Sequence, residues 1–359
     1  MHALFRLAFL ALAGTISAIA QASPPAAPAS AASAPSTDEV KWHPGHYALV
    51  SPFIAQADYA YKEFRGIQKF YNWRSLEPEK DRYDFSGIRS DLDFLAQRDK
   101  RLVIQIQTKA FSSGQNCCPP YISGPEYGGG VYKTSVGAFN PIIWDDRVNE
   151  RLLALYRELG KQFDSAPNLE AMVIPETAVT GNVKSQGEVP FAMDRYAQCV
   201  EAGMQAAKDV FPHTVVIQYF NLPVEIHQSL YDYATAHGIG LGGPDVFIND
   251  ALLLDPEKGS YPLDRRASGI VPVGVAVQPG DYLVKTHGGP PDPPTAKELY
   301  EFGRDQLQAN YMFWSTKSGY FEKVQAMMDD PSFPRDPAGG LNAGRPRELG
   351  SPQRPTAPR

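Results

Sequence analysis

The chain has 359 residues and a formal net charge of −6, and its positive charges are scattered along the sequence. This pattern excludes the basic stripe that a nucleic-acid-binding surface requires. Beyond the N-terminal stretch, no apolar run approaches the length of a membrane-spanning helix. We therefore expect neither a nucleic-acid partner nor a membrane span.

The N-terminal stretch, residues 1–22, has the pattern of a secretory signal peptide. Arg6 supplies a positive start, Leu7 to Ala20 is apolar, and Ala20-Gln21-Ala22 is a small-x-small cleavage site. The apolar segment is too short for a membrane span, and an uncleaved N-terminal anchor is the alternative. We expect a mature chain that begins at Ser23 and is periplasmic or secreted.

The segments on either side of the central part of the chain differ from it in composition. Residues 23–37 are rich in Ala, Pro and Ser and nearly uncharged, which predicts a flexible linker. Residues 334–359 are rich in Pro, Gly and Arg, which predicts a disordered tail. Residues 38–333 contain no internal linker of this kind, so we expect them to form one domain.

Eight short apolar, β-branched runs recur along this domain. They are His46–Ser51, Gly66–Trp73, Leu102–Gln107, Ala171–Pro175, Thr214–Phe220, Gly238–Gly242, Val273–Val277 and Asn310–Trp314. The helical patterns between them are Ile88–Gln97, Val148–Phe163, Met193–Val210, Val224–His237 and Ala296–Gln308. Eight such units predict an α/β protein with a single (β/α)8 TIM barrel. The main alternative is an open doubly wound sheet, but its usual Gly-rich phosphate turn does not follow the first run.

The cysteines and histidines indicate no metal or cofactor. The three cysteines are Cys117, Cys118 and Cys199. In an oxidising compartment one of the first two could pair with Cys199, which leaves one thiol over. No spacing of His and Cys suits zinc, so we expect no metal site.

Polar residues follow most of the predicted strands, where a barrel carries its functional site. Glu176 follows the fourth strand, Asn221 the fifth and Asp245 the sixth, while Gln278 and Asp281 follow the seventh. The loops supply two further candidate donors, Lys109 and His287. Carboxylates and amides hydrogen-bond to sugar hydroxyls and aromatic rings pack on sugar faces, so this mixture favours a saccharide ligand.

The segment after the second strand carries a more specific pattern. It reads Trp73-Arg74-Ser75-Leu76-Glu77-Pro78 and then Tyr83-Asp84-Phe85-Ser86. This pattern resembles the second-strand region of the (β/α)8-barrel glycoside hydrolase superfamily, in particular its retaining, clan A-like members. The resemblance implies a general acid/base at the end of strand four, which is the position of Glu176. Glu77 is interpreted as a residue that holds its own loop.

The chain departs from that superfamily pattern at two positions. The acid/base usually follows Asn, and here Pro175 precedes it; the nucleophile usually ends strand seven as Glu, and here Gln278 stands there. An amide is not a competent nucleophile, and this hydrolysis needs two carboxyl groups. Asp245 and Asp281 are the candidates for the second carboxylate, in a retaining or an inverting reaction. The alternative, which Gln278 favours, is a barrel that binds glycan without cleaving it.

The resemblance also implies the sugar-binding residues. Trp73 and Trp314 would supply aromatic faces, and Asn221 and Gln278 would bind hydroxyls. We therefore expect an exported glycoside hydrolase-like barrel that acts on a saccharide or polysaccharide, with no cofactor. A scaffold protein without a small ligand is a third possibility. The sequence leaves the sugar, the linkage and the oligomeric state open.

Overall fold

The computed structural model describes residues 39–50, 63–181 and 183–349. Its main sheet has eight strands, and all neighbouring strands in it are parallel. In sheet order these are β8 Gly240–Gly242, β7 Val215–Tyr219, β6 Leu169–Ile174, β3 Arg101–Gln107, β2 Gly66–Asn72, β1 Gly45–Val50, β10 Tyr311–Ser315 and β9 Gly274–Val277. The eight predicted strands are all present. The predicted signal peptide and linker lie outside the described residues.

The sheet closes into a barrel where its two outer strands, β8 and β9, meet. The Leu241 N–H donates to the Pro272 carbonyl at 2.9 Å, and the Ala276 N–H donates to the Gly243 carbonyl at 3.0 Å. Gly242 allows this approach, because a Cβ atom there would lie 1.6 Å from the Gly274 carbonyl oxygen. The chain order of the strands is also their order around the barrel, so the predicted (β/α)8 TIM barrel is confirmed.

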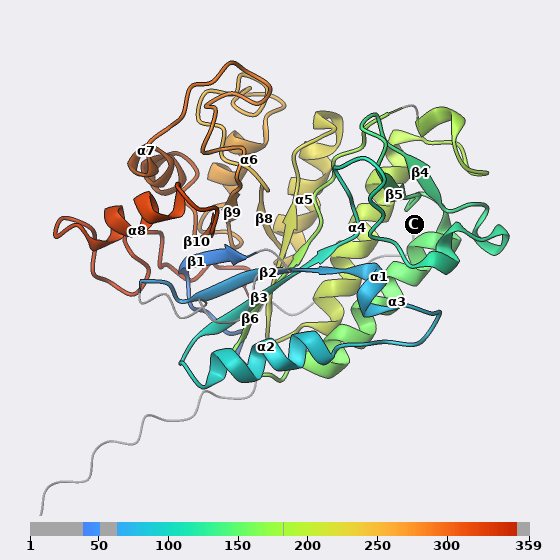
Figure 1. The fold of residues 1–359 in the computed structure, drawn as a ribbon, viewed down its shortest axis with the longest axis horizontal. Helices are drawn as coiled ribbons and strands as arrows, with labels where there is room; N and C mark the ends of the chain where they lie inside the picture. The colour runs from blue at the N-terminus through green and yellow to red at the C-terminus, as the bar shows by residue number, and fades with distance from the viewer. Residues whose placement is uncertain (1–38, 51–62, 182, 350–359) are drawn as a thin grey trace, which may run out of the picture. The chain divides into compact units, whose positions relative to one another are not determined.

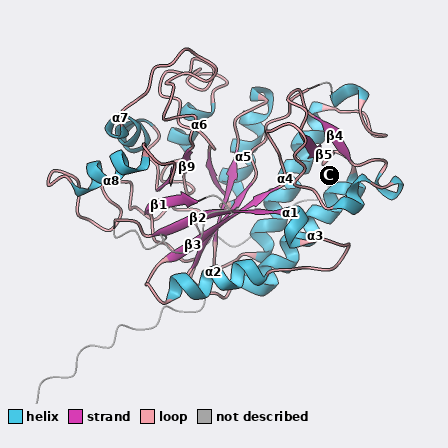
Figure 2. Ribbon diagram, viewed as in Figure 1, coloured by secondary structure: helices cyan, strands magenta, loops and turns pink. Residues whose placement is uncertain are grey.

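Helices surround these strands (Figures 1 and 2). They are α1 Trp73–Leu76, α2 Ser86–Ala96, α3 Asp146–Phe163, α4 Met193–Val210, α5 His227–His237, α6 Ser260–Ala267, α7 Ala296–Glu301 and α8 Phe321–Asp329. The five predicted helices are present, with α7 continued by a π-helical turn over Phe302–Gln306. Helices α1, α6 and α8 and the hairpin of β4 Val131–Lys133 and β5 Phe139–Pro141 were not predicted. None of the described helices combines the length and the apolar character needed to cross a bilayer.

Side chains on the strands alternate between two apolar cores. Tyr311 and Phe313 of β10 join buried residues of five other strands in the barrel interior. Met312 and Trp314 of the same strand belong to the layer between the strands and the helices. Because successive side chains on a strand point to opposite faces, a residue next to an inward-facing one is directed away from the barrel axis. This alternation decides which rim residues can reach a ligand.

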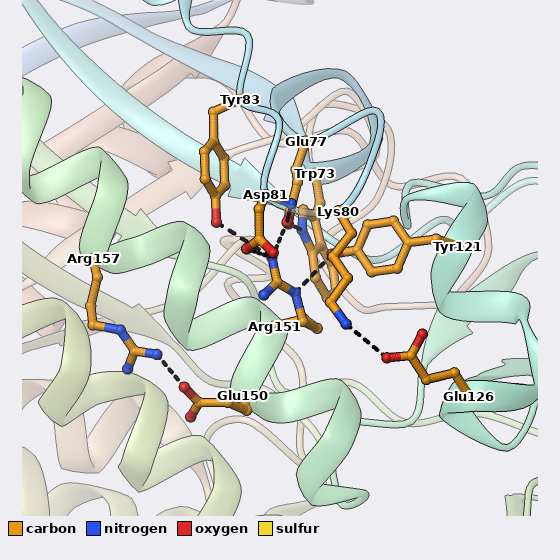
Figure 3. Close-up of polar contacts among 10 residues, drawn as sticks. All are labelled: Trp73, Glu77, Lys80, Asp81, Tyr83, Tyr121, Glu126, Glu150, Arg151 and Arg157. Atoms are coloured by element: carbon orange, nitrogen blue, oxygen red, sulfur yellow. Dashed lines mark hydrogen bonds and ion pairs between the residues drawn. The ribbon is translucent and has the colours of Figure 1, made fainter.

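The loop after β2 is held by a buried ion pair. Glu77 is fully buried, and it pairs with Arg151 of α3 and accepts a hydrogen bond from Trp73 Nε1 at 2.9 Å. Figure 3 shows the Arg151 guanidinium between this carboxylate and Tyr121, to which its Nε donates at 3.1 Å. A second ion pair, 2.8 Å long, joins Arg151 to Asp81. The Leu-Glu-Pro segment therefore fixes the loop to helix α3, as the sequence predicted for Glu77.

Residues 334–349 pack against the barrel, which corrects the predicted domain boundary at residue 333. Leu341 and Leu349 are 5% and 7% exposed. The Arg347 N–H donates to the Gly269 carbonyl at 3.1 Å, and Trp42 Nε1 donates to the Ala343 carbonyl at 3.1 Å. The content of Pro, Gly and Arg predicted disorder here, but long-range backbone hydrogen bonds and the two buried leucines hold the segment in place.

Candidate active site

A pocket with a volume of about 350 Å³ opens at the C-terminal ends of β7, β8 and β9. Its wall is formed by Asn221, Leu222, Asp245, Phe247, Asp250, Ala251, Leu252, Leu253, Thr286 and His287. Asp245 and Asn221, two of the predicted site residues, therefore line one pocket. Among the described residues the wall contains no lysine or arginine, and its ionisable side chains are two carboxyl groups and the imidazole of His287.

Glu176 lies beside this pocket, directly after β6. It lines a smaller neighbouring cavity of about 30 Å³, and Asn221 of the pocket wall donates a hydrogen bond from Nδ2 to Glu176 Oε2. The Asn221 side chain is oriented because its Oδ1 accepts a hydrogen bond of 2.7 Å from the Leu222 N–H. The amide is thus fixed with its donor toward the carboxyl group of Glu176.

Burial raises the pKa of Glu176, while the positive charge of Lys109 and the hydrogen bond from Asn221 act in the opposite direction. Burial also lowers the pKa of Lys109 to about 7, against the attraction of Glu176. Lys109 Nζ donates to the Ala178 carbonyl at 2.6 Å and to the Tyr196 hydroxyl at 3.1 Å. Lys109 is therefore a buried neighbour of Glu176, and it is not a loop donor for ligand.

Asp245 and Asp281 form a carboxyl pair at the base of the pocket. Asp281 is fully buried, and its Oδ2 accepts hydrogen bonds from the N–H groups of Val246 (2.9 Å) and Gln278 (2.8 Å). Its Oδ1 is buried and has no donor among the described residues unless a carboxyl proton supplies one. Burial, together with the negative charges of Asp281 and Glu176, raises the pKa of Asp245 well above its usual range. Burial raises the pKa of Asp281 to about 7.

The two aspartates therefore hold one proton between them near neutral pH. Two neighbouring carboxylates repel each other, and a shared proton removes that repulsion. The proton lies on Asp245, because its pKa is raised further than that of Asp281 and because the two backbone N–H groups that Asp281 Oδ2 accepts favour the charged form of Asp281. The Asp245 proton also supplies the donor that Asp281 Oδ1 otherwise lacks. Asp245 is the member of the pair that faces the pocket.

Several solved structures resemble this barrel. Endoglycoceramidase II from Rhodococcus sp., solved as a lactosyl-enzyme intermediate, has a TM-score of 0.51 and 14% identity, over 80% of this chain and 77% of that one. The catalytic domain of β-amylase from Paenibacillus polymyxa has a TM-score of 0.50 and 9% identity, over 80% and 98%. β-Galactosidase from Marinomonas ef1 has a TM-score of 0.50 and 8% identity, over 75% and 53%. No protein-family model matches the sequence, and neither does any curated protein.

The barrel resembles those of glycoside hydrolases. At these identities the likeness concerns the fold, which agrees with the resemblance seen in the sequence around strands two and four. Fold alone does not determine function, so the geometry of this barrel decides which of its residues can act on a ligand.

The two predicted tryptophan platforms do not lie at the pocket. Trp73 and Trp314 are both fully buried. Trp73 donates to Glu77 in the loop network of Figure 3. Trp314 donates to His46 Nδ1 at 2.9 Å in the layer between strands and helices. The prediction that these rings carry sugar is wrong because their faces are covered by protein.

Gln278 also does not contribute to the pocket wall. Its backbone N–H donates to Asp281, so the structure assigns the strand-seven end to holding the carboxyl pair. The predicted alternatives Asp245 and Asp281 are thereby separated into a pocket-facing residue and a buried partner.

The sequence did not indicate the apolar residues of the pocket wall. Leu222 follows Asn221, and Phe247 and Leu252 come from the loop after β8. Leucines in irregular loops lack the periodicity that reveals a strand or helix, so the sequence gives no sign that Leu252 belongs to a site. The structure identifies it, because 47% of this apolar side chain is exposed.

The structure gives no indication of a metal centre. Within the described residues, no cluster of three or more His, Cys, Asp or Glu side chains could hold a metal ion. Cys117, Cys118 and Cys199 all fall within these residues and are unbridged.

Proposed function

We propose that this protein hydrolyses O-glycosidic bonds, with Glu176 and Asp245 as its two carboxyl groups. The proposal rests on one observation: Asn221 lines the pocket beside Asp245 and donates a hydrogen bond to Glu176, so two carboxyl groups stand close together at the C-terminal ends of the strands. Burial raises the pKa of both groups. Glycoside hydrolysis by the two-carboxyl route needs one proton donor and one carboxylate. The barrel fold of known glycoside hydrolases supports the same function.

Glu176 acts as the general acid/base. Burial raises its pKa, which favours the protonated form, and it passes that proton to the glycosidic oxygen as the bond to the leaving group breaks. Asn221 holds the carboxyl group in place. In the return step Glu176 recovers a proton from the water molecule that completes hydrolysis.

Asp245 supplies the carboxylate. Its proton moves to Asp281, which is hydrogen-bonded to it and stays satisfied when neutral. The negative charge of Asp245 then stabilises the positive charge that develops on the sugar ring in the transition state. Asp281 is a positioning residue in this scheme, because it lies buried behind Asp245.

The competing proposal is a barrel that binds glycan without cleaving it. Gln278 favours it, since an amide stands where similar barrels place a nucleophile. Under this alternative Asp245 and Asn221 bind sugar hydroxyls, and the carboxyl pair contributes no chemistry.

A comparison of glycosides with poor (alkyl) and good (4-nitrophenyl) leaving groups distinguishes the two proposals. We expect wild-type protein to cleave members of a panel of alkyl and 4-nitrophenyl glycosides. Glu176→Gln should slow alkyl glycosides by about 10²–10⁴ but 4-nitrophenyl glycosides much less, because a good leaving group needs little acid assistance. Asp245→Asn should slow both. Glu225→Gln, an exposed carboxylate outside the pocket wall, is the matched control and should change neither.

The competing proposal predicts a different result. If wild-type protein binds oligosaccharides but cleaves none of the panel, the barrel is a binding protein. If cleavage occurs and survives Glu176→Gln on every substrate, Glu176 is not the acid.

We further propose that the protein is exported and begins at Ser23. The motive is the small-x-small site at Ala20-Gln21-Ala22 after an apolar run. N-terminal sequencing of the protein from the periplasm or medium should give Ser23 as the first residue. A chain that starts at Met1 in the cytoplasm would disprove export.

A further inference from the structure

One wall of the 350 Å³ pocket is apolar and stands next to Asp245. It is formed by Leu222, Phe247 and Leu252, from the loops that follow β7 and β8. Leu252 is 47% exposed, and the next leucine but one, Leu254, is 39% exposed. Large apolar side chains left open beside polar site residues often mark the place where a ligand binds.

The apolar wall is held firmly in place. Asp250 Oδ1 accepts hydrogen bonds of 3.0 Å from the N–H groups of both Leu252 and Leu253. Asp250 Oδ2 accepts a hydrogen bond of 3.1 Å from the His287 N–H, which ties the wall to the loop after β9. The Asn249 N–H also donates to the Lys285 carbonyl at 2.8 Å. The exposure of Leu252 is therefore a property of an ordered loop.

The wall suits an aliphatic group better than a sugar ring. Sugar rings pack on exposed aromatic faces. Trp73 and Trp314 are buried elsewhere. Among the residues that the structure describes, the wall contains one Phe, Tyr or Trp side chain, Phe247, which is 6% exposed and lies 5.4 Å from the His287 ring. Branched aliphatic side chains offer contact area without a preferred ring geometry, and they stabilise an alkyl chain by removing its surface from water.

The charged side chains of the wall limit which head groups the ligand can carry. Asp245 and Asp250 line the pocket, and none of the lysines or arginines in the described part of the chain does. An anionic head group would meet these carboxylates without a compensating cation, so a neutral group fits the pocket better.

We infer that the Leu222–Phe247–Leu252 wall is an aglycone subsite, which binds the aliphatic chain of a neutral alkyl glycoside while the sugar contacts Asp245 and Asn221. This inference rests on the proposed glycosidase function, because it names the leaving-group side of that substrate. The apolar wall and Asp245 line the same pocket, so the alkyl chain and the sugar belong to one ligand molecule.

Chain-length dependence of binding tests the subsite. Calorimetry would measure Kd for methyl, butyl, hexyl and octyl glycosides of glucose, galactose and maltose, below their micelle concentrations. For at least one head group, we expect affinity to rise with each methylene by up to about fourfold, the limit for full burial. Leu252→Ser should reduce this dependence, and Leu222→Ala/Leu252→Ser should reduce it further. Leu283→Ser is the matched control, since Leu283 is 40% exposed but is not part of the pocket wall.

Four outcomes overturn the subsite. These are absence of binding by every alkyl glycoside, affinity that is independent of chain length, an equal loss in the Leu283→Ser control, and a wild-type dimer that Leu252→Ser converts to monomer. The last would make a second copy of the chain the occupant of the wall. Cleavage without chain-length dependence overturns the subsite alone. If affinity depends on chain length but none of these proteins cleaves the glycosides, the proposed hydrolase function is wrong and the alkyl-binding subsite is supported.

Discussion

Removal of the buried Lys109 ammonium should move the pH dependence of catalysis. Lys109 lies near Glu176 without forming a direct ion pair, and its charge lowers the pKa of that carboxyl group against the effect of burial. Lys109→Met removes the cation, so the pKa of Glu176 rises. The acid form then persists to higher pH, and the basic limb of the pH–rate profile moves upward.

The size of this movement follows from Coulomb's law. Two unit charges roughly 6 Å apart interact by about 3 kcal/mol at an effective dielectric constant of about 20, which corresponds to about 2 pH units. Burial lowers the pKa of Lys109 to about 7, so this cation is only partly charged at neutral pH. We therefore expect the basic limb to move up by roughly one pH unit.

The assay is kcat/KM for an alkyl glycoside between pH 4 and pH 9, since an alkyl leaving group depends on the acid. Lys133→Met, which removes an exposed lysine on β4, is the matched control and should leave the profile in place. A Lys109→Met profile that keeps its basic limb would refute electrostatic control of Glu176 by Lys109. Circular dichroism would establish that the variant is folded, because Lys109 also donates to Ala178 and Tyr196.

Three further predictions concern features whose role in the fold the sequence did not predict or predicted only in part. Trp314→Phe should lower the free energy of unfolding by about 1–3 kcal/mol, because it leaves buried His46 Nδ1 without its donor, and it should leave KM unchanged. A raised KM at unchanged stability in urea titrations would restore this ring to the sugar site. Arg151→Met should cost about 3–5 kcal/mol, because Glu77 is left as an unpaired buried charge. Glu77→Gln/Arg151→Met should recover part of that loss, and a double variant no more stable than Arg151→Met would contradict the ion-pair explanation. A chain that ends at residue 333 should unfold at lower temperature than one that ends at residue 349, because it lacks the buried Leu341 and Leu349; equal Tm values would show that this segment adds no stability.

The barrel could be predicted from the sequence because its strands are continuous buried runs. Parallel strands covered on both faces are apolar along their whole length, so each of the eight runs stood out between helical patterns. The strand predicted over Gly238–Gly242 is present over Gly240–Gly242, and its last glycine allows the barrel to close. The position of Glu176 after β6 followed from the same run.

The residues of the site could be predicted only in part, because a shift of one residue along a strand turns a side chain from the barrel interior to the helix layer. Trp314 follows an inward-facing Phe313 and therefore points into the helix layer. Asp245 and Asp281 looked equivalent in the sequence, and only the backbone hydrogen bonds to Asp281 distinguish the buried partner from the pocket residue. The segment after residue 333 is held by contacts with residues far away in the chain, which local composition does not reveal.

The buried carboxyl pair of Asp245 and Asp281 should lower the stability of the folded chain as pH rises. Burial raises the pKa of Asp245 and Asp281 above the values of an unfolded chain, so the folded state binds more protons between about pH 4 and pH 7 and loses stability as pH rises through that range. Asp245→Asn removes one titrating group and gives Asp281 a permanent amide donor.

We therefore expect Asp245→Asn to abolish turnover yet raise Tm at pH 7, by roughly 2–4 °C for each kcal/mol that the raised pKa values cost the folded state. At pH 3 both aspartates are protonated in the folded and the unfolded chain, and the variant should then show no gain over wild type. Differential scanning calorimetry at the two pH values measures the difference. A Tm that falls at pH 7, or rises equally at both values, would mean that the two aspartates do not share a proton and that Asp281 serves only to hold the loop.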